Sequence, residues 1–243
     1  MIKSVSENTK YPTVCYNAAT NESHFINFKQ NTDYTPILEH VSYEDGLRYI
    51  NHFILNKLIM DNIDKFKIND TQGNPHTYNY NIGRFSPTTL RYISVLSDLS
   101  QLELNNKRIT EIGAGYGGQY CILRQLYTPA LYTFIDLPEV LPLIKKYIEG
   151  VGLNDIPINY INAHDVQDIE SDLVISNYAI SECSEIAQTN YIYKIINKSK
   201  HGYIIYNNML GYNHTDFISK SSVKIKILQE DPNTNPSSRL LVW

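Results

Sequence analysis

The stretch Arg108-Ile-Thr-Glu-Ile-Gly-Ala-Gly-Tyr-Gly-Gly-Gln119 carries the most informative pattern in the chain. An apolar run containing Ile109 and Ile112 leads into four glycines, and apolar residues at helical spacing follow from Tyr120. This order predicts a strand, a tight turn and a helix. Glycines in such a turn permit positive φ and close approach of a ligand, and the free N–H groups at the start of the helix favour polar or anionic ligand atoms.

The glycine spacing fits two classes of cofactor site. Gly113 and Gly115, followed by Gly118, match the dinucleotide pattern G-x-G-x-x-G. With Glu111 before them and Gly117 after them, the same two glycines match acid-x-G-x-G-x-G, a pattern of S-adenosylmethionine (SAM) methyltransferases. A glycine-rich turn without a ligand is the third interpretation. The motif alone does not choose among them.

Length and charge narrow the class of protein. The chain has 243 residues, a formal net charge of -4 and a pI near 6.0, which suits one catalytic domain with an extension and gives no basic field for nucleic acid. No apolar run approaches the roughly 20 residues of a membrane span, and the polar N-terminus does not resemble a signal peptide. The three cysteines are widely spaced, so we expect free thiols and no metal site. We therefore expect a soluble, cytoplasmic protein, with homo-oligomerisation left open.

The first 104 residues are predicted to form a mainly helical extension. Residues 1 to about 40 show no sustained period and are interpreted as irregular or short extended structure. A helix is expected over 44–63, followed by a loop or extended hairpin to Gly83. Ser86 before Pro87 predicts the start of a second amphipathic helix that reaches about residue 101. This extension could cover the substrate as a lid, or cap the edge of a sheet.

Residues 105–243 are predicted to form the second domain, with alternating strands and helices. The expected strands are 107–112, 131–136, 156–161, 172–177 and 202–207, and the expected helices are 117–127, 138–150, 184–199 and 215–220. Such alternation favours a doubly wound parallel sheet with helices on both faces. Val223–Leu228 and Arg239–Trp243 are predicted to pair antiparallel at the sheet edge and to bury the final tryptophan.

Polar residues follow several of the predicted strands, at the edge where open α/β sheets bind ligands. Asp136 ends the second strand, where its carboxylate could accept hydrogen bonds from both ribose hydroxyls of either cofactor, or could cap the next helix. Glu111 suits the ammonium group of a methionine moiety and would repel a pyrophosphate, which favours SAM. His164 and Asp165 follow the third strand, where an acid could accept from an adenine amino group; a solvated loop pair is the alternative. No metal-ligand geometry is recognisable there.

Three segments together resemble the SAM-dependent methyltransferases: Glu111-Ile-Gly-Ala-Gly-Tyr-Gly-Gly, Phe-Ile-Asp136-Leu-Pro-Glu-Val and Ser-Asn177-Tyr-Ala-Ile-Ser-Glu182. The chain is most similar to sugar O-methyltransferases of surface-glycan biosynthesis, and Phe85-Ser-Pro-Thr-Thr-Leu-Arg-Tyr92 shares that likeness. The resemblance implies a Rossmann-like seven-stranded sheet with an antiparallel last strand and SAM as cofactor. The implied cofactor-binding residues are Glu111, Gly113, Ala114, Gly115, Gly117, Gln119, Asp136, Leu137, His164, Asp165, Asn177 and Tyr178.

The function that this resemblance implies is methyl transfer from SAM to a hydroxyl group of a sugar or nucleotide sugar. Glu182 is the preferred general base, with His164 and His214 as alternatives; plant O-methyltransferases have a histidine where this chain has Ser181. A non-catalytic SAM-binding module that assists a glycan enzyme stays open. An NAD-dependent sugar oxidoreductase is also open, although Glu111 and the antiparallel ending speak against it.

Overall fold

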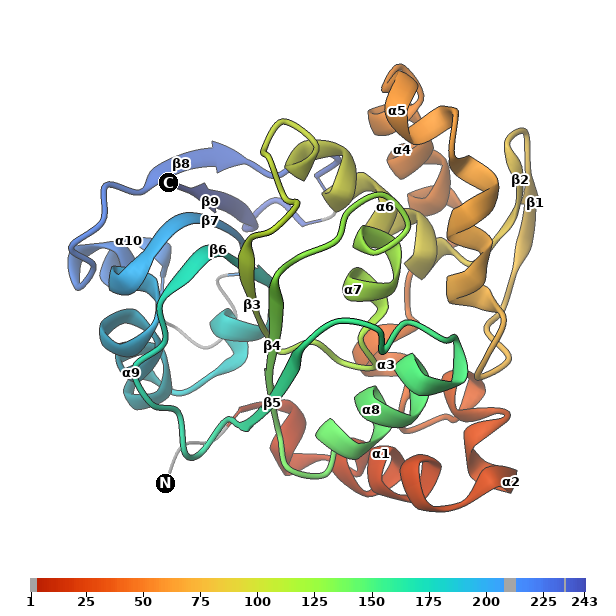
Figure 1. Ribbon diagram of the computed structural model, residues 1–243, viewed down its shortest axis with the longest axis horizontal. Helices are drawn as coiled ribbons and strands as arrows, with labels where there is room; N and C mark the ends of the chain where they lie inside the picture. Colours follow the sequence, from red (N-terminus) through yellow and green to blue (C-terminus); the bar gives the residue numbers. More distant parts are fainter. Residues whose placement is uncertain (1–3, 208–212, 234) are drawn as a thin grey trace.

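The computed structural model describes residues 4–207, 213–233 and 235–243, and within them a seven-stranded sheet forms the centre of the molecule (Figure 1). The order across the sheet is β5-β4-β3-β6-β7-β9-β8. The strands are β3 (Arg108–Ile112), β4 (Leu131–Asp136), β5 (Ile158–Asn162), β6 (Ser171–Asn177), β7 (Ser199–Tyr206), β8 (Lys226–Gln229) and β9 (Arg239–Val242). The neighbouring pairs from β5 to β7 are parallel. The predicted doubly wound sheet is therefore confirmed.

The last strand runs against its neighbours. β9 pairs antiparallel with both β7 and β8, so it lies between them and β8 forms the edge of the sheet. The sequence predicted this antiparallel pair at the edge of the sheet. In the structure the last strand of the chain, β9, lies inside the sheet, and β8 alone forms the edge. Trp243 is only half-buried; its indole Nε1 donates to the Ser199 hydroxyl at 3.2 Å. A Cβ on Gly202 would overlap the indole ring, so this glycine makes room for the C-terminal side chain.

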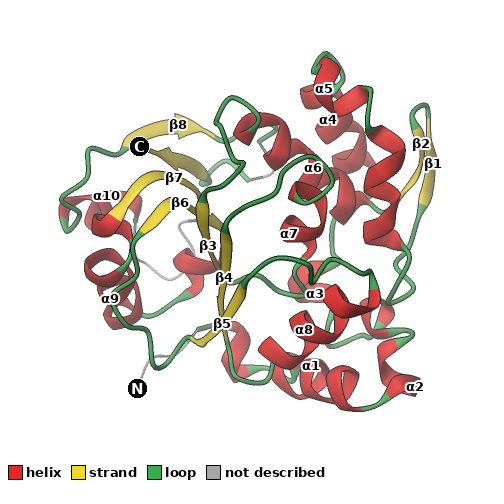
Figure 2. Ribbon diagram, in the orientation of Figure 1, coloured by secondary structure: helices red, strands yellow, loops and turns green. Residues whose placement is uncertain are grey.

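Helices cover both faces of the sheet (Figure 2). One face carries α6 (Pro87–Leu99), α7 (Gly118–Leu123) and α8 (Leu141–Gly150), and the other carries α9 (Glu185–Lys194) and α10 (His214–Ser219). Successive strand side chains point to opposite faces. Ile109 accordingly packs in the core beneath α6, α7 and α8, and Ile112 packs in the core beneath α9 and α10.

The N-terminal region is helical where the sequence predicted irregular structure. It contains α1 (Tyr11–Thr20), α2 (Glu22–Phe25) and α3 (Thr35–Leu38), with 3-10 turns at Ser6–Asn8 and Phe28–Gln30. The buried residues of α1 are Tyr11, Cys15 and Ala18. They have helical spacing, but cysteine and alanine are weak markers of an apolar face. The prediction of irregular structure was wrong for this reason.

The helix predicted over 44–63 is interrupted. The chain forms α4 (Tyr43–Phe53), α5 (Lys57–Met60) and a 3-10 helix at Ile63–Asp70. Asn56 causes the break, because its side chain caps the backbone N–H of Ile59 and also donates to the Ser97 hydroxyl on α6 at 3.0 Å. These bonds favour a turn where the apolar pattern alone predicted continuation.

Two other N-terminal predictions are confirmed. A hairpin forms from β1 (Tyr78–Tyr80) and β2 (Gly83–Phe85). Ser86 begins α6 by accepting a hydrogen bond from the backbone N–H of Thr89 at 3.1 Å, with Pro87 in the first turn. Capping of this kind satisfies a backbone donor that the helix itself leaves free.

The extension and the sheet share one core. The ring of Phe28 lies 6.0 Å from that of Tyr116 and 6.2 Å from that of Tyr147, so the N-terminal helices pack directly on the turn after β3 and on α8. Aromatic residues from both parts belong to a single buried cluster. The boundary at residue 104 stays a prediction. In the described part of the chain, none of the helices has the length and apolarity that a membrane span requires.

Candidate functional site

The glycine turn between β3 and α7 has a backbone that only glycine adopts readily. Gly113, Gly115 and Gly117 have φ values of 73°, 62° and 87°. A Cβ on Gly113 would overlap the Cβ of Ala179, and a Cβ on Gly115 would lie 2.6 Å from Cδ1 of Leu38. The turn is therefore fixed by backbone conformation and by the close approach of two other segments.

Asp136 joins this turn to the end of the next strand. Its Oδ2 accepts the backbone N–H of Gly115 at 2.9 Å, and its Oδ1 accepts the backbone N–H of Leu137 at 2.8 Å. Burial raises the pKa of Asp136 to about 7, although these backbone donors oppose the shift. The carboxyl group is thus placed at the carboxyl end of β4, beside the glycine turn.

Two adjoining cavities lie at this edge of the sheet. The larger has a volume of about 510 Å³, and the smaller has about 60 Å³. Gly113, Asp136 and Glu182 line both. The larger cavity also contacts Gly115, Asn177 and Tyr178 from the sheet side and Tyr11, Leu38, His40, Tyr49 and Arg91 from the N-terminal region. Ligands of open α/β sheets bind at this edge, outside the carboxyl ends of the strands.

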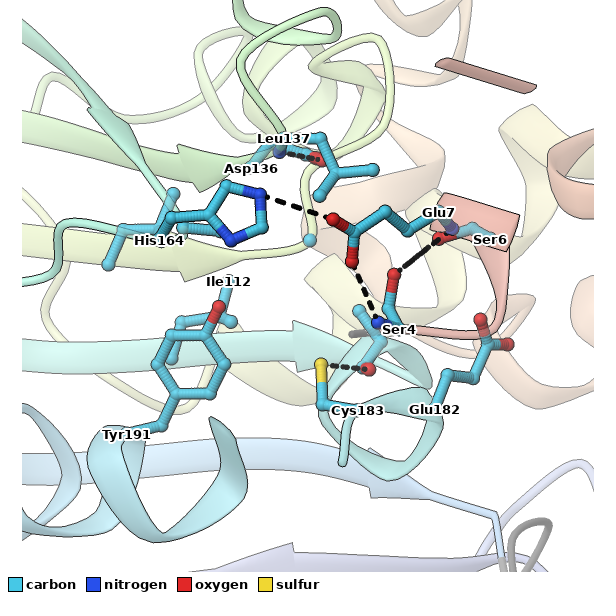
Figure 3. A pocket seen from close by; sticks show the side chains of 14 residues that line it. Ser4, Ser6, Glu7, Ile112, Asp136, Leu137, His164, Glu182, Cys183 and Tyr191 are labelled. Carbon is cyan, nitrogen blue, oxygen red and sulfur yellow. Dashed lines mark hydrogen bonds and ion pairs between the residues drawn. The ribbon is translucent and has the colours of Figure 1, made fainter. Parts of the chain in front are cut away.

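The smaller cavity is covered by the N-terminal strap, which we define as Ser4–Asn8 (Figure 3). Ser4 forms an antiparallel bridge with Cys183, and the backbone N–H of Val5 donates to the carbonyl of Glu182 at 3.0 Å. Oε1 of Glu7 lies 3.3 Å from Nε2 of His164. The strap therefore connects the loops after β5 and β6 across the mouth of the cavity.

The end of β6 presents a polar group to the larger cavity. The Asn177 amide nitrogen donates to Oε1 of Gln119 at 3.2 Å, and the Gln119 amide nitrogen donates to the carbonyl of Tyr92 at 3.2 Å. This chain of bonds leaves Oδ1 of Asn177 buried and without a hydrogen-bond partner among the described residues. Tyr178 follows with a φ of 69°, an uncommon conformation for a residue with a side chain, and its hydroxyl bonds the carboxyl group of Glu230.

Glu182 and His40 are the ionisable side chains best placed to exchange a proton with a ligand. Glu182 lines both cavities, and burial raises its pKa. His40 lines the larger cavity, and partial desolvation, reinforced by the nearby Arg91 charge, lowers its pKa and favours the neutral imidazole. A neutral imidazole or an ionised carboxylate can each accept a proton.

Other predicted site residues lie away from the cavity walls. Glu111 is 2% exposed and its carboxyl group accepts a hydrogen bond from the Tyr132 hydroxyl at 2.7 Å, in the core beneath α7. Asp165 is exposed and bonds the Asn162 amide at 3.1 Å. His214 lies on α10 and lines neither cavity. The ligand contacts suggested for these residues stay predictions that their placement does not favour.

Of the remaining predicted site residues, some line the smaller cavity and others hold the glycine turn or Asn177 in position. Leu137 and His164 line the smaller cavity. Ala114, Gly117 and Gln119 lie outside the linings and shape the turn or orient Asn177.

The sequence missed the cavity residues of the N-terminal region. Arg91 is 5% exposed although charged residues of an amphipathic helix usually face water. The available signal was its setting, because Leu90, Tyr92 and Ile93 surround it with apolar residues and the first turns of α6 contain no other charged residue.

No known protein-family model matches the chain. It is 28% identical over 135 residues to an uncharacterized protein of Rickettsia prowazekii (strain Madrid E). The match covers 53% of this chain and 24% of the relative, so the chain spans about a quarter of the length of that protein.

Several solved structures match part of this chain. A mitomycin 7-O-methyltransferase matches with a TM-score of 0.45 and 12% identity, covering 63% of this chain and 56% of that one. A TehB-like SAM-dependent methyltransferase from Corynebacterium glutamicum matches with a TM-score of 0.45 and 14% identity, covering 59% and 83%. A protein from Pyrococcus horikoshii matches with a TM-score of 0.49 and 11% identity, covering 63% and 88%. With these identities and TM-scores, the matches assign no activity and no ligand to this chain.

Proposed function

We propose that this chain is a SAM-dependent methyltransferase that methylates a hydroxyl group of a small molecule, with a sugar or nucleotide sugar as the acceptor. One observation carries the proposal. The positive-φ glycine turn after β3 and the Asp136 carboxyl group after β4 are in hydrogen-bond contact beside a cavity at the carboxyl ends of the strands. This is the arrangement that a nucleoside cofactor needs, with backbone exposed to it and a carboxylate for its ribose.

The residues present fit such a cofactor. Asp136 would accept the ribose hydroxyls. The adenine ring would lie beside Leu137 and His164, where the cavity of about 60 Å³ is smaller than the ring, so the strap would have to move outward to admit it. Oδ1 of Asn177, which has no hydrogen-bond partner among the described residues, would accept from the ammonium group of the methionine moiety. SAM, when bound, supplies a methyl group attached to a positively charged sulfur, and transfer of that methyl group leaves a neutral thioether. The contribution of the protein is to align the acceptor oxygen and to take its proton.

Glu182 is the proposed acceptor of that proton. It lies on the wall shared by the two cavities, between the expected nucleoside site and the larger space that could hold a sugar. Burial raises its pKa, which makes an ionised Glu182 a stronger base than an exposed carboxylate. The sugar acceptor itself is supported by the resemblance of the segments around Phe85–Tyr92 and Asn177–Glu182.

Calorimetry with SAM, S-adenosylhomocysteine and NAD tests the cofactor, and a mass-spectrometric screen of nucleotide sugars for the gain of one CH2 unit tests the reaction. We expect SAM and S-adenosylhomocysteine to bind and NAD not to bind. Tight binding of NAD alone would contradict the proposal and favour the oxidoreductase. A different result would favour the non-catalytic module. In that case the chain would bind SAM and methylate no acceptor, and adding the chain to a glycan enzyme would raise the activity of that enzyme.

A further inference from the structure

Arg91 is a buried cation that has no carboxyl group within ion-pair distance among the described residues. Its electrostatic neighbour Glu39 is itself buried, and burial raises the pKa of Glu39 to about 7, which favours the neutral acid. The side chain of Arg91 lines the 510 Å³ cavity, and the residue is 5% exposed. None of the ion pairs within 4.0 Å in the part of the chain that the structure describes involves Arg91. Burying an unpaired charge is costly, and native proteins usually pair such a group.

The contacts that Arg91 does make are neutral. One terminal nitrogen donates to the carbonyl of Leu38 at 3.4 Å, a long hydrogen bond. The guanidinium carbon lies 5.4 Å from the ring centre of Tyr92 and 5.8 Å from that of Tyr178. Nε is buried and has no hydrogen-bond partner in the described part of the chain. The aromatic rings hold the guanidinium in place, and its donors are left incompletely used.

The nearby carboxyl group of Asp45, which lines the same cavity, is already engaged. It accepts from the backbone N–H and hydroxyl of Ser42 at the start of α4 and lies 3.4 Å from the guanidinium of Arg48. Of the described residues that line the cavity, Arg91 is the only lysine or arginine. An anion entering this cavity would therefore meet one fixed positive charge.

We propose that Arg91 binds an oxyanion of a ligand in this cavity, a carboxylate or a phosphate. The planar guanidinium fits both groups. The oxyanion has two sources, the α-carboxylate of SAM or an acidic group of the acceptor, such as the diphosphate of a nucleotide sugar. The assignment of these sources rests on the proposed function, whereas the oxyanion site itself rests on Arg91 and its neighbours.

The test compares Arg91→Met and Arg91→Lys with the parent chain. The calorimetric probes are S-adenosylhomocysteine, 5′-methylthioadenosine, UDP-glucose and inorganic phosphate. 5′-Methylthioadenosine keeps the nucleoside but lacks the carboxylate. We expect Arg91→Met to weaken binding of at least one oxyanion probe by about 10- to 100-fold, the effect of losing one charge-assisted hydrogen bond. Affinity for 5′-methylthioadenosine should change less than about twofold, and Arg91→Lys should restore part of the loss.

The pattern of losses identifies the source. Loss with S-adenosylhomocysteine places the carboxylate of the cofactor on Arg91, and loss with UDP-glucose or phosphate alone places the acidic group of the acceptor there. The proposal is wrong if the parent and Arg91→Met bind S-adenosylhomocysteine equally well and the parent binds neither UDP-glucose nor phosphate more tightly than Arg91→Met does. If the parent binds neither S-adenosylhomocysteine nor 5′-methylthioadenosine, the proposed function is refuted instead. The measurements with inorganic phosphate would still test Arg91.

A structural role for Arg91 predicts a different result. If the unpaired charge serves only a ligand, Arg91→Met should melt without ligand at the same temperature as the parent or higher, because methionine fills the space without a charge to desolvate. Arg84→Met is the matched control, since Arg84 is exposed on the hairpin and outside this cavity. A lower melting temperature together with equal losses for all four probes would overturn the proposal.

Discussion

The carboxyl group of Asp136 and the backbone N–H of Gly115 are hydrogen-bonded at 2.9 Å. This bond joins the ends of β4 and β3, which are adjacent and parallel in the sheet. A second bond comes from the N–H of Leu137, and the carboxyl group, which has further acceptor capacity, belongs to a residue that lines both cavities. The shape of the glycine turn and the position of the expected ribose acceptor therefore depend on one side chain.

Replacing Asp136 should weaken cofactor binding strongly. Asp136→Ala removes two expected charge-assisted hydrogen bonds to ribose, each worth roughly 1.5–3 kcal/mol, so we expect at least about a tenfold loss of SAM affinity by calorimetry. Asp165→Ala is the comparison, because Asp165 is exposed and lines neither cavity. Its SAM affinity should stay within about twofold. A larger loss with Asp165→Ala than with Asp136→Ala would reverse the assignment of the two acids.

Stability should fall as the pH rises through the neutral range. Burial raises the pKa of Asp136 to about 7 and that of Glu111 to about 8, above their values in an unfolded chain. The folded chain then binds more protons between about pH 4 and pH 8, so this stabilisation is complete at low pH and is lost as each carboxyl group ionises. Glu111→Gln cannot titrate. Urea unfolding should show the parent losing at least about 1 kcal/mol more than Glu111→Gln between about pH 5 and pH 8. Parallel curves would contradict the buried, protonated Glu111.

Alanine substitutions at Gly113 and Gly152 can distinguish the cost of backbone strain from the cost of steric overlap, because the two glycines have similar φ values. Gly113 and Gly152 have φ values of 73° and 70°. A Cβ would overlap Ala179 at Gly113, but at Gly152 it would meet none of the described residues within 4 Å. Gly152→Ala should cost about 1–2 kcal/mol for the backbone alone and leave SAM binding intact. Gly113→Ala should cost more and weaken SAM binding at least about tenfold, since the turn must move. Equal melting temperatures and affinities would show that the turn tolerates the overlap.

Removing residues 237–243 should disrupt the sheet from within. β9 is bonded on both sides, to β7 and to β8, so its loss leaves two strands with unpaired edges. We expect the truncated chain to lose a cooperative thermal transition and to bind a hydrophobic dye. Trp243→Ala keeps both backbone ladders and serves as the control. A truncated chain that still melts cooperatively would show that β9 is dispensable.

The sequence predicted those helices and strands whose hydrophobic and capping patterns match their burial in the folded structure. The strands from Arg108 to Tyr206 are apolar runs separated by turn signals, and Ser86 with Pro87 is a local capping signal. The sequence did not reveal α1, because its buried face uses Cys15 and Ala18. The ligand contact of Glu111 stays a prediction. The motif gave the position of Glu111 along the chain but not the face of the strand, and the structure places its carboxyl group against the Tyr132 hydroxyl.

The candidate site divides in the same way. Asp136 and Asn177 end their strands, and Glu182 follows β6 after a short 3-10 helix, so their position at the carboxyl edge could be predicted from topology. Arg91 and His40 reach the cavity only because the N-terminal helices fold back over the sheet. That packing depends on contacts between residues far apart in the sequence, such as Phe28 with Tyr147, which no local pattern shows.

The identity of the proton acceptor can be decided by comparing Glu182 with the two nearby histidines. The hydroxyl of a sugar is a weak acid, so transfer is helped by a group that accepts its proton as the bond forms. Glu182→Gln keeps the shape of the side chain and leaves the backbone carbonyl that binds Val5 in place. Once an acceptor is known, we expect turnover to fall by roughly 10²- to 10⁴-fold with SAM affinity within about twofold.

The pH profile supplies the second measurement. Because burial raises the pKa of Glu182, the turnover of the parent should increase with pH as this carboxyl group ionises, and Glu182→Gln should lose that rise. His40→Gln and His164→Gln should keep it; His164 instead pairs with Glu7 of the strap. A fall in turnover of less than about fivefold for Glu182→Gln, with a larger fall for His40→Gln, would transfer the role to His40. In that case the proton would leave toward the wall built by the N-terminal helices, and the extension would take part in the chemistry as well as cover the site.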